Sequence, residues 1–199
     1  MQNSTVLNKD DSLPKQETKQ LKFVITPEHQ TYLNTIPKNK ANYITGFADG
    51  EASFNISFRE RNDFLIGWKI SPVFNISQKE RGILAIIKNH LGCGTIRFRN
   101  DGVWVYEVDN KDMLINKIIP FFSKFPFLSD KKKKDFSRFK KLVSIVYTNK
   151  SKTYDDIVFI CKLLEEIASK NSRKFTDEMI LDRAAKYWAL NKEKILKLN

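Results

Sequence analysis

The sequence is short of cysteine and histidine. Its 199 residues contain 2 cysteines, at positions 93 and 161 with no CxxC spacing, and 2 histidines. These numbers indicate neither a disulfide framework nor a zinc site, and are too small for a histidine metal cluster. No apolar run is long enough to cross a bilayer, and residues 1–20 lack the apolar stretch of a secretory signal. We therefore expect an intracellular protein without a membrane partner, in an organelle (mitochondrion or chloroplast) or a prokaryotic cytoplasm, and not a secreted one.

Acidic residues are too few to balance the basic ones. Lysine and arginine number 35 against 23 aspartates and glutamates, which gives a formal net charge of +12. Such an excess suits a polyanionic partner, most simply a nucleic acid. Hydrophobic residues make up 41% of the chain and include 15 phenylalanines, which excludes a wholly disordered chain.

Composition divides the chain into three parts. Residues 1–38 are predicted to be a flexible N-terminal tail and anchor, with residues 21–25 as a short strand or a segment laid over the domain. Pro27 and Pro37 are expected to bracket an irregular link. Residues 39–150 are predicted to be the core, and residues 151–199 to be helices appended to it.

Hydrophobic periodicity predicts the elements of the core. Strands are expected over 52–59, 65–77, 95–99 and 103–108, and helices over 39–50, 79–91, 112–120, 134–147, 153–170 and 176–197. The turns fall at 61–63 and 100–102, and Gly92 ends the second helix. Pro72 predicts a bulge or an edge position, and Asp109 or Asn110 is expected to cap the helix at 112. Four antiparallel strands with helices on one face give an α+β fold of order αββαββα.

One short run, from Tyr43 to Phe54, is the most informative part of the sequence. Gly46 and Gly50 lie four residues apart, so they share one helix face and allow another backbone to approach closely. Asp49 and Glu51 follow where Gly50 would let the helix stop, and strict alternation of apolar and polar residues begins at once. A glycine pair alone is a weak signal. In this order of helix, acid and alternating strand, the segment from Ile44 to Ala52 resembles the LAGLIDADG motif of homing endonucleases.

The resemblance covers roughly residues 40–150 and includes no second copy of the motif, so it implies the single-motif branch, whose members are homodimers. It implies a site-specific double-strand DNA endonuclease, intron-encoded, that hydrolyses phosphodiesters across the minor groove of a long pseudo-palindromic target and leaves short 3′ overhangs. Glu51 aligns with the metal-ligating acid of the family, with glutamate in place of the more usual aspartate, and the Gly50 carbonyl would be a second ligand. The expected ion is Mg²⁺, and Mn²⁺ or Ca²⁺ could occupy the same site. Gly46 and Gly50 would form the dimer seam, and Asp49 suits a cap or helix-end role better than a metal ligand.

Two further catalytic residues follow from the resemblance. Gln78, at the end of the second strand, would orient the attacking water, although a plain surface glutamine fits the sequence equally well. The family places a catalytic lysine just before the helix predicted at about Lys134. Within the run from Lys131 to Lys134 this points to Lys132, although such runs are usually solvated linkers.

The polar faces of the predicted strands suit the major groove of DNA, where each base pair shows a distinct donor and acceptor pattern. Ile96 and Phe98 are expected to turn toward the core. The candidate DNA-binding residues are Asn55, Ser57, Arg59, Arg61, Lys69, Ser71, Asn75, Arg97, Arg99 and Lys134. Any water-facing sheet shows similar alternation, but arginine and asparagine in place of acids favour DNA.

Three classes of function stay open at this point. The leading one is the metal-dependent endonuclease. The second keeps the scaffold as a splicing maturase acting on intron RNA, or as a DNA-binding regulator that does not cut. The third is a basic structural protein such as a ribosomal component, which would not need an acid at the end of the glycine helix.

Overall fold

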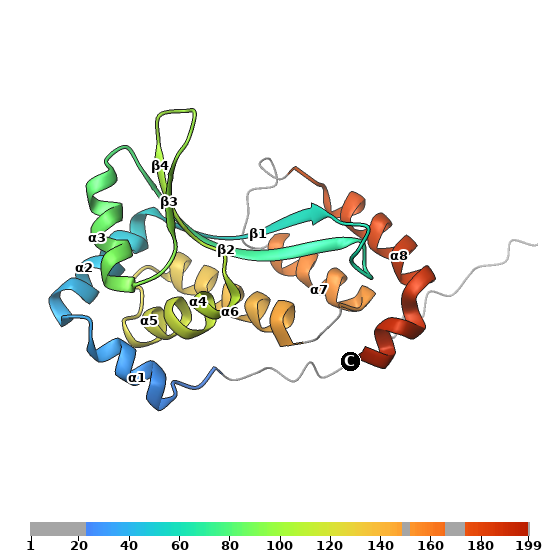
Figure 1. Ribbon diagram of the computed structural model, residues 1–199, viewed down its shortest axis with the longest axis horizontal. Coiled ribbons are helices and arrows are strands. Elements are labelled where there is room, and N and C mark those ends of the chain that lie inside the picture. Colours follow the sequence, from blue (N-terminus) through green and yellow to red (C-terminus); the bar gives the residue numbers. More distant parts are fainter. Residues whose placement is uncertain (1–22, 149–151, 166–173, 199) are drawn as a thin grey trace, which may run out of the picture.

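A curved antiparallel sheet forms the centre of the molecule (Figure 1). Its strands are β1 (Ala52–Glu60), β2 (Trp68–Gln78), β3 (Thr95–Phe98) and β4 (Trp104–Val108), and they lie in the order β1-β2-β4-β3. Ala52 pairs with Ile76 and Glu60 with Trp68, so β1 and β2 form one long hairpin. The predicted four-stranded antiparallel sheet is confirmed.

The structure is a computed structural model that describes residues 23–148, 152–165 and 174–198. The predicted tail over 1–20, the boundary at residue 150 and residues 166–170 of a predicted helix lie outside the described residues. Over 23–25 the chain is not a strand. Phe23 instead stacks on His29, with ring centroids 5.4 Å apart, and packs against the core as an anchor.

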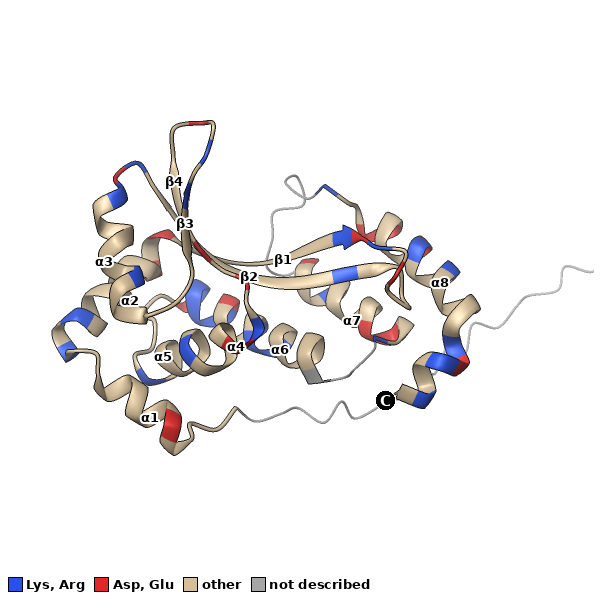
Figure 2. Ribbon diagram, in the orientation of Figure 1, with Lys and Arg blue, Asp and Glu red and all other residues tan. Residues whose placement is uncertain are grey.

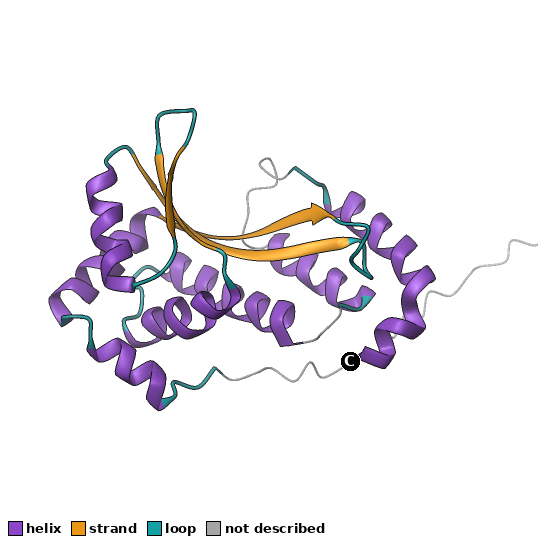
Figure 3. Ribbon diagram, viewed as in Figure 1, coloured by secondary structure: helices purple, strands orange, loops and turns teal. Residues whose placement is uncertain are grey.

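Helices cover one face of the sheet (Figure 3). In chain order they are α1 (Pro27–Asn34), α2 (Lys38–Glu51), α3 (Arg81–Leu91), α4 (Lys111–Met113), a π-helical turn (Leu114–Ile118), α5 (Ile119–Lys124), α6 (Asp130–Thr148), α7 (Tyr154–Glu165) and α8 (Asp177–Leu198). Helices α4 to α7 lie beneath the sheet, and among the described residues no helix covers the opposite face of the β1–β2 hairpin (Figure 1). The alternation in both strands explains this, because apart from Val73 their apolar side chains point to one face.

The core has two parts along the sheet. In the first, the ring of Phe54 lies 4.9–6.2 Å from five other phenylalanine rings, from β2, α5, α6 and the loop before α6. In the second, Trp68 and Ile70 at the far end of the hairpin pack with buried residues of α6, α7 and α8. The C-terminal helices therefore extend the core under the outer half of the hairpin.

Several local predictions are wrong at the N-terminal side. The link between Pro27 and Pro37 is not irregular, because α1 forms there and buries Leu33. The Thr26 side chain caps this helix in a capping box with His29, and Pro27 occupies the first turn, where a missing N–H costs nothing. Gly50 does not end α2. The helix continues to Glu51, and Gly50 does not have the positive φ of a helix-ending glycine.

Two prolines lie inside elements: Pro120 departs from expectation, whereas Pro72 takes the edge position that was one of its two predicted alternatives. Pro120 does not end the helix that Asn110 caps, because a π-helical turn before it accommodates the missing N–H and α5 continues to Lys124. Pro72 causes no bulge; it pairs with Ile56, and β4 pairs with β2 only from Phe74 onward, so β2 is locally an edge there.

Three other boundaries or orientations also change. Strand β2 begins at Trp68 and not at residue 65, because the turn extends to Gly67, which has a φ of 76°. Helix α6 begins at Asp130, so the lysine run is its first turn and not a linker before it. Phe98 does not point into the core; it is 57% exposed and packs against Trp104, with ring centroids 4.8 Å apart.

Candidate active site and nucleic-acid interface

The C-terminal end of α2 carries the predicted metal ligands. Glu51 is its last residue and is exposed, and among the described residues its carboxylate has no hydrogen bond and no ion pair. Gly50 lies in the same last turn, where backbone carbonyls lack an intrahelical partner. The negative end of the helix dipole adds to the Glu51 charge. This end of α2 therefore attracts a cation.

Asp49 has a different role, as expected. Its Oδ2 accepts the backbone N–H groups of Leu128 and Ser129, each at 2.9 Å, and its Oδ1 accepts the Ser129 hydroxyl. Burial would raise the pKa of the Asp49 carboxyl, but these hydrogen bonds and the Lys132 charge outweigh it and lower that pKa. Asp49 thus holds the start of α6 against the end of α2.

Lys132 also lies at this junction. Its Nζ donates to the carbonyl of Ala52, the residue that follows Glu51, and the side chain is partly buried. Burial lowers the pKa of Lys132, and the charges of Asp135, Asp49 and Glu51 act in the opposite direction. Its neighbours Lys131, Lys133 and Lys134 are exposed. The tertiary structure thus distinguishes Lys132 from the rest of the run.

Gln78 lies near the same junction. It ends β2 two residues beyond Ile76, the partner of Ala52, and opposite Trp104 of β4. Its side chain is partly exposed. The sheet register therefore brings the end of β2 next to the end of α2.

One chain supplies only part of a metal site. Within residues 23–148, 152–165 and 174–198, no three His, Cys, Asp or Glu side chains gather closely enough to hold an ion. The donors at the end of α2 are the Glu51 carboxylate and helix carbonyls, which are the oxygen ligands that Mg²⁺ and Ca²⁺ prefer. The donor set fits such an ion but needs oxygens from elsewhere to complete it.

The outer face of α2 is open. A Cβ built on Gly46 or Gly50 would meet no described atom within 4 Å. Tyr43, on the same helix, is 53% exposed and stacks on Phe47 with ring centroids 6.2 Å apart. The predicted seam residues therefore lie uncovered beside the Glu51 end of the helix.

The predicted DNA-binding residues of the strands share the sheet face that no described helix covers. Ser57 pairs with Ser71 and Arg59 with Lys69, so their side chains lie side by side on that face. Figure 2 shows basic segments on β1, β2 and β3. Lys134 differs, because it lies on α6, away from this face.

Three of the predicted arginines have carboxylate partners that the sequence analysis missed. Arg61 pairs with Asp63 at 2.6 Å, Arg97 with Glu107 at 3.3 Å, and Arg99 with Asp101 at 2.5 Å. The first and third pairs are two residues apart in turns. An Arg-x-Asp pattern at a hairpin turn was the available signal.

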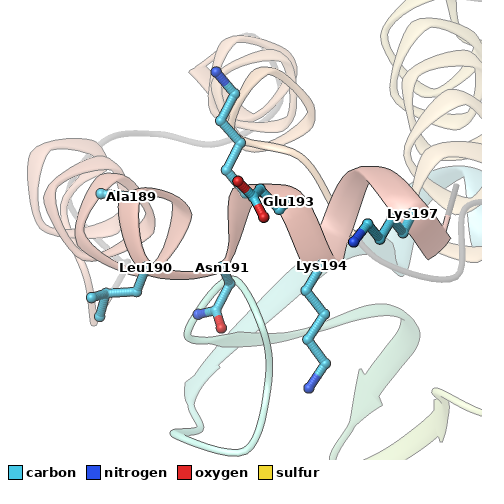
Figure 4. A pocket seen from close by; sticks show the side chains of 7 residues that line it. Ala189, Leu190, Asn191, Glu193, Lys194 and Lys197 are labelled. Carbon is cyan, nitrogen blue, oxygen red and sulfur yellow. The ribbon is translucent and has the colours of Figure 1, made fainter.

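A hollow of about 610 Å³ runs along α8, lined by residues 189–194 and 197 (Figure 4). All of these residues come from one helix, and the side chains diverge. Asn191 points to the β1–β2 turn, where it donates to the Leu65 carbonyl at 3.2 Å. The hollow is not a convergent ligand site. In the described part of the chain, no helix has the length and apolar character needed to cross a membrane.

Comparisons with known proteins agree with this geometry. Homing endonuclease I-ApeII of Aeropyrum pernix is 28% identical over 146 residues, which are 70% of this chain and 86% of that protein. Probable intron-encoded endonuclease 2 of Neurospora crassa is 34% identical over 133 residues, but these are 65% of this chain and only 28% of that longer protein.

Solved structures show the same fold. The archaeal intron-encoded homing endonuclease I-Vdi141I complexed with DNA superposes with a TM-score of 0.66 at 31% identity, over 75% of this chain and 96% of that one. The family model described as LAGLIDADG endonuclease matches residues 44–143. Because this match covers half of the chain, including the second half of α2, the whole sheet and most of α6, the protein belongs to the LAGLIDADG endonuclease family.

Proposed function

We propose that this protein cuts double-stranded DNA at a specific site, as a homodimer that depends on a divalent metal ion. One observation carries the proposal. The unpaired Glu51 carboxylate lies at the exposed end of α2, directly beside a glycine face that nothing in the described chain covers. A second copy packed through Gly46 and Gly50 would bring the two Glu51 carboxylates together, which supplies the oxygens that one chain lacks.

Each catalytic group has a role that its position supports. Glu51 and the Gly50 carbonyl would hold Mg²⁺, which when bound supplies an activated water and stabilises charge on the phosphate. Lys132, held beside Glu51 through the Ala52 carbonyl, offsets charge that develops in the transition state. Gln78 orients the attacking water with its amide.

The sheet face without a covering helix is the proposed DNA surface. It carries the polar and basic strand residues, and the relative I-Vdi141I was solved with DNA. A twofold dimer doubles this surface and predicts a long pseudo-palindromic target. With one Glu51 per strand near the twofold axis, both strands are cut across the minor groove to leave short 3′ overhangs.

The test is cleavage of a plasmid library that carries randomised inserts, in Mg²⁺, by the wild type and by Glu51→Gln. We expect linear products with one recurrent target for the wild type. The variant should bind that target but not cut it, because it loses a ligand charge and keeps the fold. Glu193→Gln, an exposed change on α8, is the control and should cut normally. Wild-type rates in Glu51→Gln would refute the assignment of Glu51.

The second candidate is a splicing maturase on intron RNA or a DNA-binding regulator. The high positive charge suits either partner. Specific binding without any cleavage in Mg²⁺ or Mn²⁺ would favour the regulator, and stimulation of intron self-splicing would favour the maturase. The compartment of the protein stays a prediction.

A further inference from the structure

Arg61 is held in one orientation by two neighbours in the turn that joins β1 to β2. Its Nε and Nη2 donate to the two carboxylate oxygens of Asp63, at 2.7 and 2.6 Å. Its guanidinium also lies over the ring of Phe64, 5.5 Å from the centroid. A flexible exposed arginine normally samples many rotamers, and this one is fixed on two sides.

The geometry of the pair decides which edge of Arg61 is left for a ligand. Asp63 occupies the edge formed by Nε and Nη2. The guanidinium has five N–H donors, so Nη1 and the outer hydrogen of Nη2 stay available as a second fork. A fork of this spacing matches O6 and N7 of guanine in the major groove.

Helix α8 holds the turn itself in place. Arg183 Nε donates to the Gly67 carbonyl at 2.9 Å, and its Nη2 donates to Asn62 Oδ1 at 2.7 Å. The Tyr187 hydroxyl donates to the same Asn62 oxygen at 2.7 Å. The turn is therefore tied to α8 at both of its ends.

Gly67 shows that the turn and α8 fit closely. Its φ of 76° suits glycine, and a Cβ there would lie 2.7 Å from the ring of Tyr187. The Trp68 indole, next along the chain, donates to the Ile180 carbonyl at 3.0 Å, which adds a buried contact to α8. Any other residue type at this position would have to displace the Tyr187 ring.

The turn lies at the far end of the hairpin from Glu51. Strand β1 has nine residues, from Ala52 beside Glu51 to Glu60 before the turn. At about 3.3 Å per residue this is roughly 30 Å, so the turn would reach the outer part of each half-site.

We propose that Asp63 is a specificity-determining residue: it fixes Arg61, on the turn held by α8, to read one guanine near the outer end of each half-site. The proposal rests on the proposed function. Without Asp63, the arginine is free to swing to a backbone phosphate, which every sequence offers. Asp63 also repels phosphate, so its loss removes a penalty on non-target DNA. The carboxylate thus lowers general affinity and raises discrimination.

The experiment measures the binding of the full-length protein to all single-base variants of the target recovered from the randomised plasmid library. Arg61→Ala should lose guanine discrimination of about 5- to 150-fold at one outer position and little elsewhere. Asp63→Asn should lose discrimination at that same position while its affinity for non-target DNA stays equal or rises. Asn62→Ala, which cuts two links to α8, should show a smaller loss at the same position.

The matched control is Asp182→Asn, which breaks another exposed pair, with Lys186 on α8, and should leave the profile unchanged. Full discrimination in Asp63→Asn, or a uniform loss of affinity for all sequences, overturns the inference. Specific cleavage by the wild type together with either result leaves the proposed function intact. A wild type that shows no specific binding or cleavage overturns both.

Discussion

The Asp49 carboxylate, in the last turn of α2, accepts both the backbone N–H and the hydroxyl of Ser129, the residue before α6. Ser129 Oγ in turn accepts the backbone N–H of Lys132 at 3.3 Å. A side chain from one helix therefore fixes the start of another, and this places the Lys132 side chain beside Glu51. Asp49 thus positions the start of α6, and with it Lys132, beside the predicted metal ligand Glu51.

Asp49→Asn should destabilise the fold in a pH-dependent way. The pKa of Asp49 is lowered in the folded state, so its contribution is fully present above the ordinary value of 3.8 and is lost as the pH falls below it, through the folded pKa. We expect a cost of about 0.5–2 kcal/mol at pH 7, as for loss of a helix cap. Urea unfolding of both proteins from pH 7 to pH 3 should show the two curves converging in acid. A difference that is independent of pH would contradict this role.

Lys132→Met should slow the chemical step. The neutral side chain cannot offset transition-state charge, so single-turnover cleavage of bound target should fall by about 10²- to 10³-fold. Single-turnover conditions separate this from weaker binding, and thermal unfolding checks the fold. Lys88→Met, at an exposed position on α3, is the control. An unchanged single-turnover rate would exclude Lys132 from the active site.

Gly46→Leu should break the dimer without unfolding the chain. A Cβ at Gly46 would have no contact within 4 Å in the described part of the chain, so we expect the clash of the larger side chain to come from a second copy. Overpacking such a seam costs about 1–3 kcal/mol. Light scattering should give about twice 23.3 kDa for the wild type and the monomer mass for the variant. Gly82→Leu, on the equally open face of α3, should stay dimeric. A wild type that is monomeric on DNA would refute the homodimer.

Arg97→Ala and Lys134→Ala should affect DNA binding differently. Arg97 lies on the proposed reading face, so its loss should cost about 1–3 kcal/mol at one base pair in each half-site. Lys134 lies on α6, where phosphate contact is expected. Its loss should weaken binding to every sequence. It should also reduce the slope of log binding constant against log salt concentration by about one. If Arg97→Ala lost affinity for all sequences alike, and Lys134→Ala lost affinity at one base pair only, the sheet would not be the surface that reads the DNA.

Local patterns in the sequence determined the strand faces, several turns and caps, and the family of this protein. The alternation in β1 and β2 sets which side chains face the helices, because successive residues in a strand point to opposite faces. The turn at 100–102 and the glycine cap at Gly92 follow from local backbone geometry. The motif around Glu51 identified the family, which the match over 44–143 confirms. Each of these signals depends on residues close together in the chain.

Only the tertiary structure decided which residues meet. Lys132 contacts Ala52 across 80 positions of sequence, and Arg183 contacts Gly67 across 116. A run of four lysines has no internal feature that selects one of them; burial against the end of α2 does so. Likewise, nothing local to Gly67 predicts that Tyr187 will pack against it. The sequence specifies these contacts through the packing of the whole chain, so they become visible only when helices and sheet are assembled.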